Sequence, residues 1–474
     1  MTRAQKLQAS PRYRWLVLWT VMGGLFSVNV TFTLLAVALP RIAKDFGTTE
    51  NTMTWVITGP LLAFGVAAPT LGKAADQYGA KRIYQLGLLL SLSAAALSAL
   101  AWGALPLIAI RVIGSLEGAA TGAASMALVM RSFDRSERVK AMGWWSLVGA
   151  GGPVIGVVLG GLVLESVGWR WVFAAQVPLI LIAFIVGSIV LSETDTLPPQ
   201  KFDIAGALTL SLGITALLFA INRGPEMGWV HPVVIVSFAL CPVLLYSFVL
   251  AERRTDAPLI SLEYLKKPAF ALPVAASALA NAAYMGGFIV TPLLLQKVYG
   301  LSEQEIGLLV IARPLTFSLL SPVAGYLAVK IGQRTSAVAG TFFVVASMGL
   351  FASLGVTAPE MLIIGALSLS GVGLGISQPS ISAGVANAVE DQDLGVASAA
   401  QQLMQNVGIV SGIQIMTSVQ TSLAHGAVGV AALDSFRVAY LVGGAIGLAG
   451  VFLALGVKNE HRRPEPHPEL HEPF

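Results

Sequence analysis

The stretch LGKAADQYGAKR, residues 71–82, places Lys73, Asp76, Lys81 and Arg82 between two long apolar runs. Only 11% of the 474 residues are charged and 55% are hydrophobic, so charge this dense is unusual within the chain. A soluble protein normally carries about 25% charged residues. The stretch is therefore typical of a polar connector between two segments that lie in an apolar solvent.

The apolar runs are long enough to cross a bilayer as helices, which takes roughly 20 residues. They are mostly continuous rather than alternating, which favours helices over a β-barrel. We expect an all-α membrane protein whose first span is retained and is not a cleaved signal peptide. Fourteen spans are predicted, at 15–38, 52–72, 83–102, 104–127, 141–163, 169–191, 204–221, 231–250, 270–293, 305–328, 335–355, 359–385, 398–422 and 435–456.

The basic residues predict how these spans are oriented. Of the 29 Lys and Arg residues, 21 lie in segments that are cytoplasmic if the N-terminus is, 6 lie in outer loops, and Arg111 and Arg313 lie inside spans. Basic loops normally face the cytoplasm, so both termini and the 73–82 connector are predicted there. The inner loop 386–397 is acidic and is the exception. The net charge of +4 is attributed to these loops and not to nucleic-acid binding.

Other chemistries find no support in the residues. The single cysteine, Cys241, excludes an intramolecular disulfide and a thiolate metal cluster. The sequence has no Ser/His/Asp nucleophile set, no phosphate-binding loop and no zinc-ligand spacing. We therefore expect no enzyme activity, no metal and no bound cofactor.

The connector has a second copy further along the chain. The stretch GYLAVKIGQR, residues 325–334, repeats its spacing at a constant separation of 253 residues, with the matched pairs Gly72 and Gly325, Gly79 and Gly332, Lys81 and Arg334. Duplicated halves are typical of transporters that work by alternating access.

These residues also carry a family resemblance. The connector resembles the major facilitator superfamily signature Gly-x-Leu-x-Asp-Arg-x-Gly-Arg-Arg, matching it at Gly72, Asp76, Gly79, Lys81 and Arg82. RVIGSLEGAATG from Arg111 resembles the fourth-helix signature, and GGPVIGVVLGG (151–161) resembles the Gly-Pro-rich motif of exporters. GWRWVFAAQVP (168–178), FDIAGALTLSLG (202–213) and INRGPEMGW (221–229) are similar to stretches of the fourteen-span drug:proton antiporters.

The resemblance implies two six-helix bundles, residues 1–200 and 253–458, joined by an extra helix pair at 201–252. It also implies multidrug efflux from a bacterial-type cell membrane, powered by the proton gradient, by a protein that works as a monomer. The segment 459–474 is rich in proline and charge, so it is predicted to be a disordered tail.

Two motifs are candidates for conformational gating. In the connector, Asp76 stands where a helix leaves the membrane and can face the positive N-terminal end of another helix, while Lys81 and Arg82 can bridge to it or to lipid phosphate. In the exporter motif, Gly152 and Gly156 share a helix face and Pro153 favours a kink. The alternatives are a solvated loop that only sets topology, and ordinary packing of small residues.

Only three charged residues lie inside the predicted spans. Placing one at the bilayer centre costs at least about 2.5 kcal/mol, so Arg111, Glu117 and Arg313 should face a cavity or a partner. Glu117 follows Arg111 by six residues, which predicts different faces of one helix. We interpret the three as proton-coupling candidates, with Glu117 as the carrier. The alternative for Glu117 is a structural acid that hydrogen-bonds across helices.

The first span lacks the acid that related exporters often carry, because Thr31 stands at that position. Polar residues at membrane depth are candidates for the cavity wall, namely Asn29, Thr31, Thr33, Asn281, Tyr284 and Gln378. Gln401, Gln405 and Asn406 are further polar residues at that depth. A mostly apolar cavity with few polar groups suits an amphipathic or cationic substrate. Each of these residues could instead form a helix–helix hydrogen bond.

The sequence thus predicts a proton-coupled exporter of hydrophobic or cationic compounds. The nearest alternative is an exporter of the same fold that moves a specific metabolite or lipid, with weak or no proton coupling. A membrane enzyme or a sensor is the more distant alternative, since neither convergent catalytic residues nor a soluble domain is found.

Overall fold

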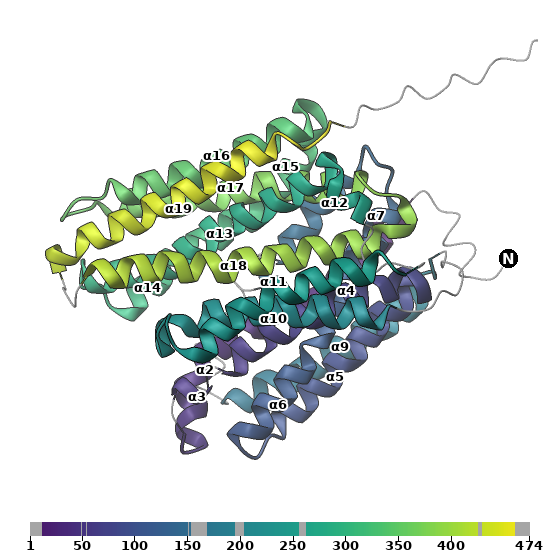
Figure 1. Ribbon diagram of the computed structural model, residues 1–474, viewed down its shortest axis with the longest axis horizontal. Helices are drawn as coiled ribbons and strands as arrows, with labels where there is room; N and C mark the ends of the chain where they lie inside the picture. Colours follow the sequence, from purple (N-terminus) through teal and green to yellow (C-terminus); the bar gives the residue numbers. More distant parts are fainter. Residues whose placement is uncertain are drawn as a thin grey trace, which may run out of the picture.

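The computed structural model describes residues 12–48, 50–53, 55–149, 151–152, 168–194, 203–255, 262–424 and 429–459. These residues form helices, and none of them forms a strand (Figure 1). Among these described residues, eleven helical stretches are long and apolar enough to cross a membrane. The prediction of an all-α membrane protein is therefore confirmed, while the number of fourteen spans stays a prediction.

The first part of the chain forms one bundle. Its helices are α2 (Tyr13–Asp45), α3 (Glu50–Met53), α4 (Trp55–Tyr78), α5 (Ala80–Ala99), α6 (Ala104–Gly114), α7 (Leu116–Ser132), a helix over residues 138–149, and α9 (Trp169–Val190). Within it, α5 packs on α7 and α9, and α2 packs on α9.

The last part forms a second bundle. Its elements are α12 (Leu262–Lys266), α13 (Pro268–Lys297), α14 (Glu303–Val310), α15 (Ala312–Ile331), α16 (Gln333–Ala352), α17 (Glu360–Asn387), η1 (Asp391–Asp393), α18 (Leu394–Ala424), η2 (Gly429–Ala432) and α19 (Leu433–Ala454). Here α13 packs on α18 and α19, and α16 packs on α17 and α19. Asn459 Oδ1 accepts a hydrogen bond from the Arg334 amide at 2.9 Å, so the first residue of the predicted tail is held by the bundle. The rest of that tail lies outside the described residues.

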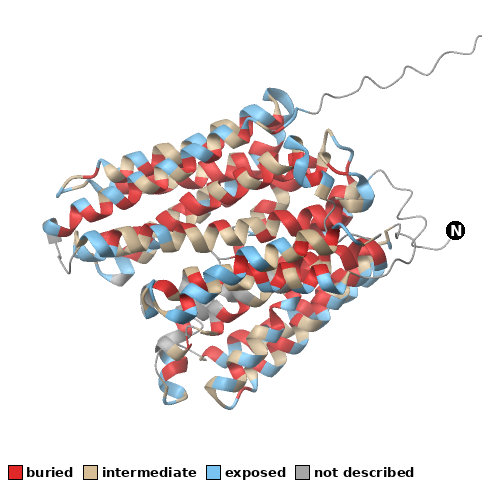
Figure 2. Cartoon of the chain, in the orientation of Figure 1, coloured by how far each residue is buried: buried red, intermediate tan, exposed pale blue. Residues whose placement is uncertain are grey.

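Between the bundles in sequence lie α10 (Ile204–Met227) and α11 (Pro232–Glu252), which pack on each other as a hairpin. The α10 helix also packs on α4 of the first bundle and on α18 of the second (Figure 1). The outward side of α11 is apolar and exposed, including Val236 and Val243. Figure 2 shows the same distribution across the molecule, with buried residues inside and exposed ones on the periphery. Such an exposed apolar periphery is expected where lipid is the solvent.

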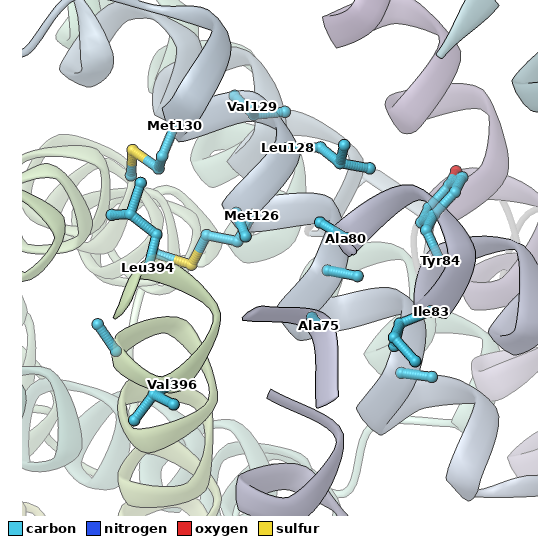
Figure 3. Close-up of a cluster of buried hydrophobic side chains, with 14 of the residues drawn as sticks. Ala75, Ala80, Ile83, Tyr84, Met126, Leu128, Val129, Met130, Leu394 and Val396 are labelled. Atoms are coloured by element: carbon cyan, nitrogen blue, oxygen red, sulfur yellow. The ribbon is translucent and has the colours of Figure 1, made fainter. Parts of the chain in front are cut away.

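The two bundles share a hydrophobic core at one end. Ala75, Met126 and Met130 of the first bundle belong to the same buried cluster as Leu394 and Val396 of the second (Figure 3). We call this the connector end, because it also carries the 73–82 connector. The N-terminal turn of α18 is thereby packed into the first bundle.

Two predicted spans are interrupted. The span 104–127 is divided at Ser115, whose hydroxyl donates to the Val112 carbonyl at 2.6 Å and so competes with the helical ladder. The span 305–328 is divided at Ile311, shortly before Pro314, which has no N–H for the preceding turn. Sequence hydropathy does not detect either break, since both stretches stay apolar.

Candidate functional site

A cavity of about 310 Å³ lies between the two bundles. Its wall combines residues of α2, α4, α6, α7 and the 138–149 helix with residues of α18. The apolar part of the wall is formed by Leu25, Val28, Pro60, Phe64, Trp145 and Ile409. Because α18 belongs to the second bundle, a movement of one bundle against the other changes the shape of this cavity.

Arg111 and Glu117 are the charged residues of the cavity wall among the described residues. They stand six residues apart, on α6 and α7, which are separated at Ser115, and both border this cavity. Glu117 is only 8% exposed, and its Oε2 atom has no hydrogen-bond partner within the described part of the chain. The Arg111 guanidinium lies 5.8 Å from the centre of the Phe173 ring. A cation and a carboxylate therefore border one mostly apolar space.

The second bundle contributes amides to the cavity. Gln402, Gln405 and Asn406 all line it, and their spacing of three and four residues puts them on one face of α18. Gln402 comes very close to α7, since a Cβ atom at Gly122 would lie 2.3 Å from its Oε1. Gln402 was missed as a candidate. The spacing of these amides within an apolar span is the signal that could have identified it.

Two of the predicted cavity residues lie behind this wall. The Gln405 amide donates to Ser277 Oγ at 2.9 Å, and the Gln378 amide donates to the same oxygen at 3.4 Å. Asn281 donates to Gln378 Oε1 at 3.4 Å and to the Ser277 carbonyl at 2.8 Å. Asn281 and Gln378 thus belong to a buried hydrogen-bond network that supports Gln405.

Arg313 and Tyr284 lie together, within the second bundle and apart from the cavity wall. Arg313 is 0% exposed and donates from Nη1 to the Tyr284 carbonyl at 3.1 Å. Its guanidinium also lies 5.3 Å from the Tyr284 ring centre and 5.8 Å from that of Phe351. Of the three charged residues predicted inside spans, the structure therefore brings Arg111 and Glu117 to one cavity and places Arg313 elsewhere.

Several predicted site residues cannot be placed. The side chains of Asn29, Thr31 and Thr33 lie outside the described residues, although the α2 backbone that carries them is helical. Pro153 and Gly156 also lie outside the described residues, while Gly152 is described and buried.

At the connector end, Asp76 joins the two bundles. It is 0% exposed and accepts hydrogen bonds from the Gly395 amide at 2.9 Å and the Val396 amide at 2.8 Å, both in the first turn of α18. This is the contact with a helix N-terminus expected from the sequence. Gly72 makes it possible, because a Cβ atom there would lie 2.4 Å from Ala399 Cβ. Its basic partner is Arg131, whose Nη2 is 2.8 Å from Asp76 Oδ1.

The acidic loop 386–397 faces the basic segment that follows α7. Arg138 is 2% exposed and donates to Asp391 Oδ1 at 2.8 Å and to Asn387 Oδ1 at 3.2 Å. Arg131 donates to the Asp391 carbonyl at 3.0 Å. The exception to the positive-inside pattern is therefore explained: this loop carries the carboxylate that pairs with arginines of the other bundle.

Lys81 and Arg82 contact the first bundle, not Asp76. Lys81 Nζ donates to the carbonyls of Leu191 at 2.6 Å and Ser188 at 3.0 Å, and Arg82 lies 3.5 Å from Glu193. Gly79 allows this arrangement, since its φ is 102° and a Cβ atom would lie 2.2 Å from the Glu193 carboxylate. The predicted bridge from these two cations to Asp76 is corrected: Lys81 and Arg82 hold the chain that follows α9.

Comparisons with known proteins agree with this architecture. The family model of the Major Facilitator Superfamily matches residues 21–413 and 275–474. The chain is 27% identical over 401 residues to the Multidrug resistance protein Stp of Mycobacterium tuberculosis (strain CDC 1551 / Oshkosh), covering 84% of this chain and 74% of the relative. It is 25% identical over 391 residues to the Multidrug transporter protein MdtP of Bacillus subtilis (strain 168), covering 82% and 72%.

Two further likenesses extend the comparison. The Tetracenomycin C resistance and export protein of Streptomyces glaucescens is 27% identical over 425 residues, covering 88% of this chain and 77% of that protein. The crystal structure of the human organic anion transporter MFSD10 (TETRAN) superposes with a TM-score of 0.66 at 15% identity, over 94% of this chain and 100% of the other. At that identity the superposition supports the fold alone.

Proposed function

The chain belongs to the major facilitator superfamily, and on that premise we propose that it is a secondary transporter that exports amphipathic, preferentially cationic compounds in exchange for protons. The observation that carries the proposal is the position of Glu117 beside Arg111 in a cavity shared by both bundles. Relatives named as multidrug resistance and transporter proteins support the export direction. We expect the protein to act as a monomer in the cell membrane.

The cavity suits such a substrate. Its apolar and aromatic side chains can hold a hydrophobic body, while the Glu117 carboxylate can hold one positive charge. The amides of Gln402, Gln405 and Asn406 can accept or donate hydrogen bonds without favouring one substrate. This combination fits recognition by charge and shape better than recognition of a specific pattern of hydroxyls, as a sugar would require.

Glu117 can couple export to protons by simple competition. When its carboxylate is ionised it attracts a cation, and when it is protonated that attraction is lost. Arg111 borders the same cavity and can compensate the carboxylate when the substrate has left. One site would then hold either a proton or a cationic substrate, so the two move in opposite directions.

The orientation of the chain completes the proposal. With fourteen spans and both termini in the cytoplasm, the connector end faces the cytoplasm. The contacts of Asp76, Arg131 and Arg138 with the α17–α18 region then close the cytoplasmic side in this conformation. In Figure 1 the two bundles are closer at this end than at the opposite end. Export requires these contacts to break when the cavity opens inward, so they bias the balance between the two access states.

The decisive experiment compares wild type with Glu117→Gln in proteoliposomes, using a panel of fluorescent lipophilic cations. The amide keeps the size of the side chain but cannot titrate. Uphill, proton-driven transport should be lost while downhill exchange is retained. Glu263→Gln removes an exposed carboxylate on α12 and should behave as wild type. A Glu117→Gln protein that still moves protons and concentrates the cations as wild type does would disprove coupling through this residue.

A further inference from the structure

Aromatic side chains meet at the seam where the 138–149 helix of the first bundle touches α15 of the second. The Trp144 indole N–H donates to the Tyr326 hydroxyl at 3.4 Å, across the seam. Trp19 of α2 lies beside Trp144, with ring centres 5.1 Å apart. Lys140 Nζ lies 5.8 Å from the Tyr326 ring centre, also across the seam. Lys330 is exposed and follows Tyr326 by four residues, which puts it on the same face of α15. We define the seam patch as Trp19, Lys140, Trp144, Tyr326 and Lys330.

The helices under the patch touch backbone to backbone. A Cβ atom at Gly143 would lie 2.5 Å from the Ser321 carbonyl oxygen, and one at Gly325 would lie 2.7 Å from the Val139 carbonyl oxygen. With the helices this close, bulky side chains at the contact are directed outward. Trp19 is 50% exposed and Tyr326 is 42% exposed. Trp19 and Tyr326 therefore form an open surface, while Trp144 between them is partly buried and packs against the core.

The aromatic rings of the patch lie further from the connector ends of their helices than the lysines do. Trp19, Trp144 and Tyr326 stand five or six residues from the connector ends of their helices, which corresponds to roughly 8–9 Å at 1.5 Å per residue. Lys140 and Lys330 stand only one or two residues from those ends, or about 2–3 Å. Tryptophan and tyrosine prefer the boundary between headgroups and acyl chains, while lysine reaches to the phosphates.

The charge around the patch is positive. Lys140 forms an ion pair of 2.9 Å with Glu137, which also binds Arg14. Partial burial raises the pKa of Glu137, but the ammonium of Lys140 and the guanidinium of Arg14 outweigh this and hold that pKa below its ordinary value. Glu137 is thus ionised at neutral pH. Arg14 and Lys140 share this one carboxylate, and Lys330 on α15 adds a further exposed cation, so the patch carries a surplus of positive charge that suits an anionic partner.

We propose that the seam patch binds the headgroup of an anionic phospholipid from the leaflet at the connector end. Lys140 and Lys330 contact the phosphate, and the three rings contact the glycerol region and the first part of the acyl chains. The patch is assembled from both bundles, so a lipid seated on it favours the conformation in which the connector end is closed. This second statement rests on the proposed alternating-access function, whereas lipid binding itself does not.

The test uses the full-length protein in phosphatidylcholine nanodiscs that contain a small fraction of diazirine-labelled phosphatidylglycerol. After illumination, adducts are mapped by mass spectrometry. We expect them to concentrate on residues 138–149 and 312–331. Each basic residue near an anionic surface contributes about a fivefold gain in affinity, so Lys140→Gln with Lys330→Gln should reduce adduct formation at least about fivefold.

Three further variants make the result specific. Lys140→Arg with Lys330→Arg keeps the charge and should retain the adducts. Glu137→Gln removes the carboxylate and should increase them. Arg253→Gln with Lys266→Gln removes two exposed cations away from the patch and should leave them unchanged. Uniform labelling, equal labelling by diazirine phosphatidylcholine, or displacement of the lipid by inorganic phosphate would overturn the proposal. None of these outcomes bears on Glu117, so the proposed transport function is tested separately.

Discussion

Asp76 and Gly395 are separated by 319 positions in the sequence, yet the Gly395 amide donates to Asp76 Oδ1 at 2.9 Å. The carboxylate belongs to the end of α4 in the first bundle, and the amide belongs to the first turn of α18 in the second. At that position the buried carboxylate accepts hydrogen bonds from two backbone N–H groups, which oppose the cost of burying its charge. They do so only while the connector ends of the bundles are in contact.

Asp76→Asn should therefore open the connector end without unfolding the protein. Hydrogen bonds to a charged group contribute about 1.5–3 kcal/mol, so the ratio of closed to open molecules should fall roughly tenfold or more. The measurement is labelling of Asn406→Cys, in the cavity wall, by a membrane-impermeant thiol reagent added at the connector side in a Cys241→Ser background. Asp134→Asn, an exposed change at the same end, serves as the control. If Asp76→Asn is labelled as slowly as the parent protein, the connector only sets the topology and does not hold the connector end closed.

Gly72→Ala should have a similar effect for a steric reason. The added Cβ would lie 2.4 Å from Ala399 Cβ and 2.7 Å from the Gly395 carbonyl oxygen, so α4 and α18 must move apart. Overpacking of this kind costs about 1–3 kcal/mol. Gly349→Ala is the matched control, because nothing lies within 4 Å of a Cβ atom there. The same thiol assay should show faster labelling for Gly72→Ala and parental labelling for Gly349→Ala. Equal rates for the two variants would contradict the close approach.

The ion pairs of Glu137 should make the stability of the folded protein depend on pH. Its pKa is lower in the folded protein than in the unfolded chain, so its ion pairs stabilise the fold above the ordinary value of 4.5. That contribution is lost as the pH falls through the lowered folded value. Glu137→Gln should reduce stability by about 1 kcal/mol or less at pH 7, as expected for partly exposed pairs. Thermal unfolding of wild type and variant should therefore differ at pH 7 and converge only once the pH lies below the lowered pKa of Glu137 in the folded protein. A difference that persists at low pH would show that packing, not charge, is responsible.

The predicted topology can be examined with single cysteines. In a Cys241→Ser background, a cysteine at Arg82 or in the C-terminal segment should react only from the cytoplasmic side, and one at Gly300 only from outside. The motivation is the surplus of basic residues on one side of the predicted spans. Labelling in intact cells and in inverted vesicles gives the two sides. A C-terminal segment that is labelled from outside would reject the fourteen-span arrangement.

Periodicity and composition predicted the membrane class and most helix positions, because the lipid solvent imposes long apolar runs. They also predicted that Asp76 would meet a helix end. They could not identify its partner Arg131 or the contact of Arg138 with Asp391, since these pairs span 55 and 253 positions and leave no trace in local spacing. The acidic composition of the loop 386–397 was the one sign of this contact in the sequence. Its meaning became clear only when the structure placed the loop against the basic segment that follows α7.

The cavity brings together residues that helical spacing alone did not pair. Arg111 and Glu117 stand six residues apart, yet both line the cavity wall. Arg313 looked equivalent to these residues in the sequence, because all three are charges in apolar runs. Its burial against Tyr284 and Phe351 depends on how the second bundle packs, which the sequence of one span does not contain.

The position of α10 has a consequence for molecules dissolved in the bilayer. Because α10 packs on both α4 and α18, it stands outside the wall formed by Phe64, Gln402 and Gln405. A hydrophobic compound that diffuses sideways toward this wall meets the α10–α11 hairpin before it meets the cavity. The lateral surfaces of the transporter are therefore unequal. The membrane is screened from the cavity along the α4–α18 side, and a compound that enters directly from lipid has to approach from a different side.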